Sequence, residues 1–216
     1  MTVPLPSPEA ILFDWDNTLV DNWPVIAAAL NAALTAMGQA AWTEAEVRAR
    51  VRRSARETFP EMFGDRAEEA ERIFYAAFAA GHLAGLAPMA GAVAALDAAA
   101  ARGIYLAVVS NKHGGFLRAE ADHLGWTGRF GRIVGATDTA ADKPAPEPVL
   151  AALEGTGIAP GLSVWFVGDA GIDMECAART GCVPVLVRDE TTLGAEFDRW
   201  PPRLHLPHCL ALASLF

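Results

Sequence analysis

Lysine is almost absent from this chain. Only two of the 216 residues are lysines, Lys112 and Lys143, whereas fifteen are arginines. The formal net charge is −9 at pH 7, and an acidic surface disfavours nucleic acid as a partner. Because positive charge is scarce, a site for an anion has to gather its few cations locally. We therefore expect no nucleic-acid partner.

Cysteines and long apolar runs are also scarce. The cysteines, Cys176, Cys182 and Cys209, are odd in number and unclustered, which argues against a disulfide framework and a zinc site. No uncharged apolar run reaches the roughly 18 residues of a membrane helix, and residues 1–7 lack the basic region of a signal peptide. We expect a soluble, cytoplasmic protein with no membrane partner.

Two acids follow the first apolar run of the chain. The run at residues 11–13 leads directly into Asp14 and Asp16, and then to Thr18. A short apolar run that ends in turn-forming residues predicts a buried strand opening into a loop. Carboxylates at such a place are costly to desolvate unless a cation or a reaction compensates them. The end of this strand is therefore the first candidate site.

Residues 21–85 show only helical patterns. Helices are expected at 24–37, from a capping-box pattern at 43–46 onward, and at 65–82. The alternation of apolar and polar residues that is typical of strands is missing from this stretch. We therefore expect an all-helical insertion.

From residue 86 onward, strand and helix patterns alternate. The expected strands are 104–109, 132–135, 164–167 and 183–187, and the expected helices are 91–102, 116–124, 146–155, 174–180 and about 208–215. This alternation predicts an α/β fold with a parallel sheet that helices cover on both faces. Ligands bind such a sheet at the carboxyl ends of its strands.

Polar residues gather at those strand ends. Ser110 and Asn111 follow one strand, Asp169 and Asp173 follow another, and Lys143 precedes a helix. Each has an ordinary structural explanation when it is taken alone, as a helix cap, a strand-ending turn or a loop lysine. Together with the two acids of the first strand they predict one functional site.

Four motifs in this order resemble the haloacid dehalogenase-like hydrolase superfamily. They are Asp14-x-Asp16-x-Thr18, Val108-Val109-Ser110-Asn111, Lys143-Pro144 and Gly168-Asp169-x3-Asp173. The chain is most similar to the branch of phosphoglycolate phosphatase and β-phosphoglucomutase. The resemblance implies a Rossmann-like core formed by residues 1–20 and 86–216, with a helical cap at 21–85. Asn17 stands where the family most often has glycine, and asparagine tolerates a positive φ.

The resemblance also implies a Mg²⁺-dependent phosphatase that acts on a small phosphorylated metabolite, phosphoglycolate-like or a sugar phosphate. Phosphoryl transfer needs a nucleophile, an acid for the leaving oxygen, and positive charge. By resemblance, Asp14 forms an aspartyl-phosphate and Asp16 transfers the proton. The implied metal ligands are Asp14, the main-chain carbonyl of Asp16, and Asp169.

The remaining motif residues would support that chemistry. The resemblance implies that Ser110, the main-chain amide of Asn111, and Lys143 bind phosphate oxygens. Asp173 would hold metal-bound water or orient Lys143, and Thr18 belongs to the first motif.

Particular residues argue against two other reactions of this superfamily. Asp16 argues against dehalogenation, because a halide leaving group needs no proton. The helical insertion contains no lysine, which argues against the Schiff base of the phosphonatases. A β-phosphoglucomutase-like mutase shares all four motifs and remains an alternative. A non-catalytic domain that binds a phosphorylated ligand also remains, although the intact nucleophile and acid disfavour it.

The insertion contains five arginines within residues 47–56. The spacing of Val47, Val51 and Ala55 suggests an apolar stripe on one helix, with Arg48, Arg52 and Arg56 beside it. A solvated face paired with nearby glutamates is the ordinary explanation. The alternative is a basic patch for the distal anion of the substrate, and Arg56 is the candidate specificity residue.

Overall fold

The computed structural model describes residues 5–51, 53–190 and 193–216. These residues form two compact units. The α/β unit combines the chain up to residue 20 with residues 88–216, and the helical unit comprises residues 21–87.

The α/β unit contains a six-stranded sheet among the described residues. Its strands, in spatial order, are β5 (Arg132–Ala136), β4 (Tyr105–His113), β1 (Ala10–Phe13), β6 (Val164–Gly168), β7 (Val183–Val187) and β8 (Leu204–Leu206). Every neighbouring pair is parallel. All four residues of β1 are buried, as expected for a central strand of a parallel sheet. The expectation of an α/β fold with a parallel sheet is confirmed.

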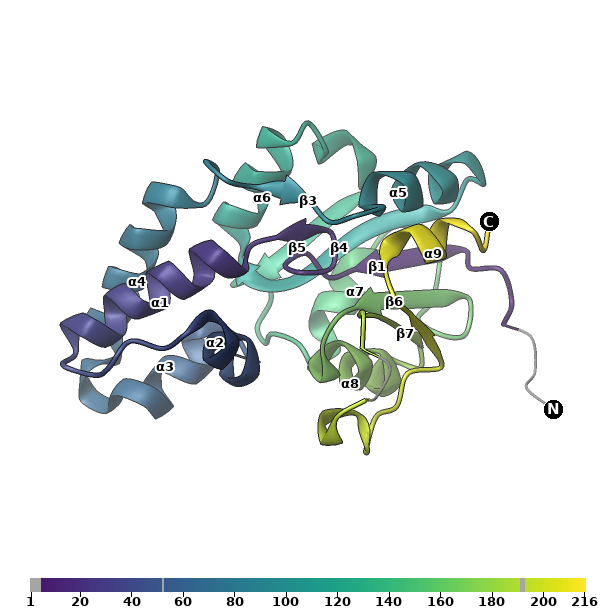
Figure 1. The fold of residues 1–216 in the computed structure, drawn as a ribbon. Coiled ribbons are helices and arrows are strands. Elements are labelled where there is room, and N and C mark those ends of the chain that lie inside the picture. Colours follow the sequence, from purple (N-terminus) through teal and green to yellow (C-terminus); the bar gives the residue numbers. More distant parts are fainter. Residues whose placement is uncertain (1–4, 52, 191–192) are drawn as a thin grey trace. The chain divides into compact units, whose positions relative to one another are not determined.

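Helices cover both faces of this sheet. They are α5 (Ala92–Ala101), α6 (Gly114–His123), α7 (Glu147–Leu153), α8 (Gly171–Thr180) and α9 (Cys209–Ala213), with short 3-10 turns at Thr127–Arg129 and Ala195–Phe197. In Figure 1, α5 and α9 lie side by side over one face, and α7 and α8 lie under the other. Leu12, Phe166 and Val149 belong to the buried cluster on the face of α7 and α8. Burial of this apolar surface is the main stabilising contribution to the unit.

The register of the sheet aligns the ends of the central strands. Phe13, the last residue of β1, lies opposite Val108 of β4 and Val167 of β6. The polar residues that follow β1 and β6, and those that follow Val108 within β4, therefore lie at the same edge of the sheet. This is the edge at which parallel α/β sheets bind ligands.

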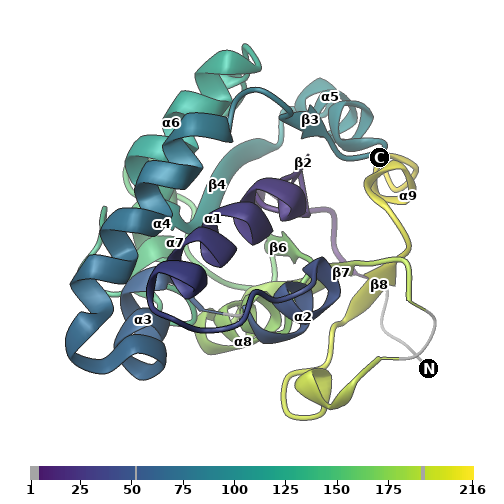
Figure 2. The same ribbon diagram turned by 60° about the vertical axis from the view of Figure 1, so that its left-hand side comes forward.

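The helical unit contains α1 (Trp23–Ala36), α2 (Glu44–Arg50), α3 (Ala55–Phe63), a 3-10 turn (Gly64–Arg66) and α4 (Ala67–Gly81). Figure 2 shows α1 and α4 running alongside each other. Leu30, Leu34, Val47 and Phe59 form the unit's own buried cluster. Where the chain enters and leaves the unit, β2 (Val20–Asp21) and β3 (Ala87–Pro88) pair as a two-stranded sheet.

The single helix expected through residues 47–55 is wrong. Helix α2 ends at Arg50, Val51 is extended, and α3 begins at Ala55 after Ser54. The stripe of Val47, Val51 and Ala55 therefore does not exist on one helix, and Arg52 lies outside the described residues. The break lets Val47 of α2 and Phe59 of α3 both enter the same buried cluster.

Two further differences concern strands. Strand β4 continues through Ser110 and Asn111 to His113, with an irregularity in its pairing to β5. Strand β8 was not expected, because it has only three residues and lies directly after Pro201-Pro202 and Arg203. Among the described residues, no helix is both long enough and apolar enough to cross a membrane.

Candidate active site

The first motif forms a tight loop after β1. The Asp14 amide donates a hydrogen bond to the carbonyl of Val167 at 2.8 Å, which ties the loop to β6. The carbonyl of Trp15 accepts hydrogen bonds from Leu19 and Val20 at 2.9 and 3.1 Å. Asn17 adopts a φ of 63°, the left-handed conformation that asparagine tolerates better than most residues. The loop forms as expected without glycine.

Lys143 lies buried between two carboxylates. Its Nζ is 2.6 Å from Oδ1 of Asp14 and 2.8 Å from Oδ1 of Asp173, and its side chain is 2% exposed. Burial alone would lower the pKa of Lys143, but the carboxylates of Asp14 and Asp173 outweigh it and raise that pKa. The ammonium group therefore stays charged beside Asp14.

Asn111 holds the main chain at Lys143. Its side-chain amide donates to the carbonyl of Lys143 at 3.0 Å and accepts from the amide of Lys143 at 2.9 Å. Ser110, which is buried, accepts a hydrogen bond from the amide of Lys112 at 3.2 Å. The structure thus brings Ser110, Asn111 and Lys143 together, and the side chain of Asn111 orients the loop of the lysine.

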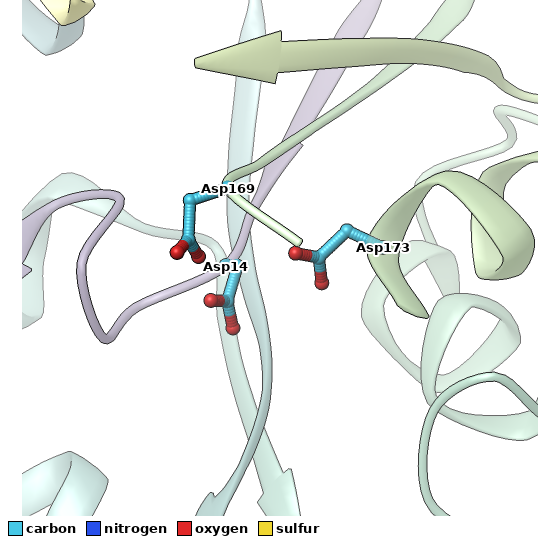
Figure 3. A group of neighbouring side chains, drawn as sticks. All are labelled: Asp14, Asp169 and Asp173. Atoms are coloured by element: carbon cyan, nitrogen blue, oxygen red, sulfur yellow. The ribbon is translucent and has the colours of Figure 1, made fainter. Parts of the chain in front are cut away.

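Three carboxylates face one another at this edge of the sheet. Asp14, Asp169 and Asp173 each place an oxygen within 4.8 Å of the other two, and Figure 3 shows their side chains converging from two strand ends and a helix start. Thr18 lies beside them, with its Oγ1 3.4 Å from Oδ1 of Asp169.

Burial raises the pKa of two of these acids. The pKa of Asp14 rises from 3.8 to about 7, because desolvation outweighs the effect of the Lys143 ammonium. Asp169 is partly exposed, but desolvation and the nearby carboxylate of Asp14 also raise its pKa. Closely spaced carboxyl oxygens with one ammonium among them fit a hard divalent cation such as Mg²⁺.

Gly168 leaves the space that Asp173 needs. A Cβ at Gly168 would lie 2.3 Å from Oδ2 and 2.5 Å from Cβ of Asp173. Oδ2 of Asp173 accepts a hydrogen bond from the amide of Ala170 at 3.1 Å, at the start of α8. Glycine in this motif is therefore a packing requirement of the site.

Sequence reasoning missed the partners of Asp16. Oδ1 of Asp16 lies 2.6 Å from Nζ of Lys112, whose Nζ also lies 2.7 and 2.9 Å from the two carboxyl oxygens of Glu120. The carboxylate of Asp16 therefore does not belong to the group of three acids. The available signal was the scarcity of lysine, because one of the two lysines, Lys112, directly follows the Ser110-Asn111 motif.

Arg56 belongs to the helical unit. It lies exposed in the first turn of α3, so it is not among the groups that the α/β unit brings together. Its expected role in substrate recognition remains a prediction.

The chain belongs to the haloacid dehalogenase-like hydrolase family. The model of that family matches residues 11–187, a range that contains all four motifs. This finding confirms the family that the motifs indicated.

Two relatives named as phosphoglycolate phosphatases indicate the finer class. The chain is 35% identical over 192 residues to phosphoglycolate phosphatase of Rhodospirillum rubrum, covering 83% of this chain and 79% of the relative. It is 33% identical over 184 residues to the phosphoglycolate phosphatase of Xylella fastidiosa, covering 83% and 80%. These relatives confirm the expectation of a phosphatase-type hydrolase.

Solved structures share the fold. A haloacid dehalogenase-like family hydrolase of Streptococcus pneumoniae superposes with a TM-score of 0.83 at 21% identity, over 96% of this chain and 97% of the other. This similarity supports the assignment of the fold.

A side chain at position 168 would collide with Asp173. We expect Gly168→Ala to displace Asp173 and lower the free energy of unfolding by about 1–3 kcal/mol, as overpacking does. Urea denaturation measures the change. Gly161→Ala is the matched control, because a Cβ there meets nothing within 4 Å. Equal stability of the two variants would show that Asp173 moves without cost.

The raised pKa of Asp14 makes the stability of the protein depend on pH. Its folded value of about 7 exceeds the ordinary 3.8, so the folded protein binds more protons than the unfolded chain between these values. The stability contributed by protonated Asp14 is therefore lost as pH rises from about 4 to 7. Without Mg²⁺, we expect Asp14→Asn to become progressively more stable relative to wild type across this window.

Urea denaturation in the presence of a chelator, at several pH values, measures that difference. Asp97→Asn is the control, because the Asp97 side chain is 59% exposed. A stability difference between Asp14→Asn and wild type that does not change between pH 4 and 7 would contradict the raised pKa of Asp14.

Proposed function

We propose that this protein is a Mg²⁺-dependent phosphatase that hydrolyses a small phosphorylated metabolite through an aspartyl-phosphate on Asp14. The main observation in support is the position of Asp14 at the end of β1, 2.6 Å from the buried ammonium of Lys143 and beside two further acids. A nucleophile needs such nearby positive charge to meet a phosphate dianion.

The reaction has two steps in this proposal. In the first, an oxygen of Asp14 bonds to phosphorus while the bond to the leaving oxygen breaks, and Asp16 donates a proton to that oxygen. In the second, water attacks the phosphorus of the aspartyl-phosphate, Asp16 takes its proton, and the carboxylate of Asp14 is released. The products are an alcohol and inorganic phosphate.

The phosphate oxygens would be held by Ser110, the main-chain amide of Asn111, and Lys143. Ser110 and Lys143 are buried, so their interactions with a bound phosphate would be weakly screened by water. Asn111 keeps Lys143 in place through its two main-chain hydrogen bonds. Asp173 would orient the ammonium from the other side.

The Mg²⁺ ligands in this proposal are Asp14, Asp169 and the main-chain carbonyl of Asp16. When bound, the ion supplies positive charge that neutralises the phosphate and the surrounding carboxylates. Asp173 lies close enough to contribute a ligand or to hold a coordinated water. Thr18 would orient Asp169 through its hydroxyl group.

Phosphoglycolate is the first substrate to test, because the relatives at 33–35% identity are phosphoglycolate phosphatases. Residues 21–85 would act as a cap that excludes water during catalysis. Within that cap, Arg56 would bind the distal anion of the substrate. We place the enzyme in the cytoplasm.

The proposal makes Asp14 indispensable. We expect Asp14→Asn to lower kcat for phosphoglycolate by about 10³-fold or more, because the amide cannot form the covalent intermediate. Release of inorganic phosphate in the presence of Mg²⁺ measures the change. Asp97→Asn, an exposed and distant substitution, should retain wild-type turnover. Unchanged turnover in Asp14→Asn would refute the proposed mechanism.

A hexose 1-phosphate separates phosphatase from mutase. We expect free phosphate to accumulate from it, if it is a substrate. Formation of hexose 6-phosphate would identify a mutase instead. Absence of turnover on every phosphate ester tried, with tight binding of one of them, would favour the non-catalytic alternative.

A further inference from the structure

Lys112 lies at the centre of a second buried charge cluster. Its side chain is 5% exposed, and its Nζ contacts Asp16 at 2.6 Å and the carboxylate of Glu120 at 2.7 and 2.9 Å. Lys112 comes from the end of β4 and Glu120 from α6. The motif loop, a strand and a helix of the α/β unit thus meet at one ammonium group.

Glu120 is itself held in place. Its side chain is fully buried, and its Oε2 accepts a hydrogen bond from Nε1 of Trp15 at 2.7 Å. Trp15 is fully buried and packs edge-on against Trp126 and Phe130, with ring centroids 5.8 and 6.4 Å away. The residue between the two motif acids therefore anchors the carboxylate that holds Lys112.

Stability alone does not account for this cluster. Two carboxyl groups share one ammonium group, and buried ion pairs are often no more stabilising than apolar residues of similar volume. Glu120 already supplies Lys112 with a counter-ion. The additional contact with Asp16 ties the motif loop to this buried pair and restricts the rotamers of a side chain that is 18% exposed.

We propose that Lys112, braced by Glu120 and Trp15, is a positioning residue that holds the Asp16 carboxyl group where it protonates the leaving oxygen. This inference rests on the proposed phosphatase function. Lys112 does not contact the phosphate in this account. Each of the two lysines then pairs with one acid of the first motif, Lys143 with Asp14 and Lys112 with Asp16.

The test uses the dependence of the rate on the leaving group. An alkoxide such as that of phosphoglycolate needs a proton as it departs, whereas the anion of 2,4-dinitrophenol does not. The value of kcat/KM reports the step in which Asp14 is phosphorylated. A defect in proton donation therefore lowers kcat/KM for phosphoglycolate much more than for 2,4-dinitrophenyl phosphate, whereas general damage lowers both equally.

The main variant combines Lys112→Met with Glu120→Gln. The double change avoids an unpaired buried glutamate, and the glutamine oxygen can still accept from Trp15. With Mg²⁺ present, we expect kcat/KM for phosphoglycolate to fall by about 10–100-fold, as misplacement of a catalytic group does. The value for 2,4-dinitrophenyl phosphate should change by less than about threefold. Glu120→Gln alone, which keeps the lysine, should show the same selectivity with a smaller loss.

Two control variants give the largest change expected in the substrate ratio and no change. Asp16→Asn should show the largest difference between the substrates, about 10²–10⁴-fold. Arg118→Met changes another residue of α6 and removes its exposed ion pair with Asp138. This variant should leave the substrate ratio unchanged. Melting temperatures verify that each variant is folded.

The positioning role would be overturned if kcat/KM in the double variant or in Glu120→Gln fell equally for both substrates, did not fall, or rose. Turnover by the wild-type enzyme would still support the phosphatase proposal in that case. If Asp16→Asn itself shows no leaving-group selectivity, the assignment of Asp16 falls and the inference falls with it. If wild type and Asp14→Asn are equally inactive with Mg²⁺, the phosphatase proposal itself is refuted.

Discussion

Pairing of buried ammonium groups with carboxylates is the interaction on which the candidate site depends. The chain has two lysines, and both place their Nζ within 2.6 Å of an acid of the first motif. Each is held by a second acid as well, Glu120 for Lys112 and Asp173 for Lys143. Without these cations, the carboxylates at the strand ends would be costly to bury. In a protein of net charge −9, both lysines lie beside acids of the candidate site.

The parallel sheet makes this pairing possible. Residues from distant parts of the chain meet because β1 lies between β4 and β6 in aligned register. Asp14 and Lys143 are 129 positions apart in sequence and yet in contact. Gly168 then permits Asp173 to approach the end of β6. Backbone geometry thus sets the distances, and the side chains supply the charge.

The sequence predicts which residues lie at the ends of the strands. Strand ends in a parallel sheet share an edge, so the convergence of Asp14, Ser110 and Asp169 follows from the order of strands and helices. Lys143 joins them from the loop before α7. Such reasoning does not find Glu120, which lies in a helix eight residues after Lys112 and has no strand-end position. Its contact depends on how α6 packs and on the irregular end of β4, which local patterns do not encode.

The helical unit shows the same limit. Helical patterns in the sequence predicted α1 and α4. The break between α2 and α3 escaped prediction, because residues 47–55 also fit one helix locally and only the shared cluster of Val47 and Phe59 favours two. Strand β8 likewise depends on pairing with β7 and not on its own three residues.

Identification of the phosphorylated residue would decide whether Asp14 is the nucleophile. Wild-type enzyme would be mixed with Mg²⁺ and substrate labelled in its phosphate, quenched in acid within the first turnover, and digested for mass spectrometry. We expect an acid-stable, hydroxylamine-labile label on the peptide that contains Asp14, at that residue. A label on another side chain, or turnover with no protein-bound phosphate at any quench time, would contradict it.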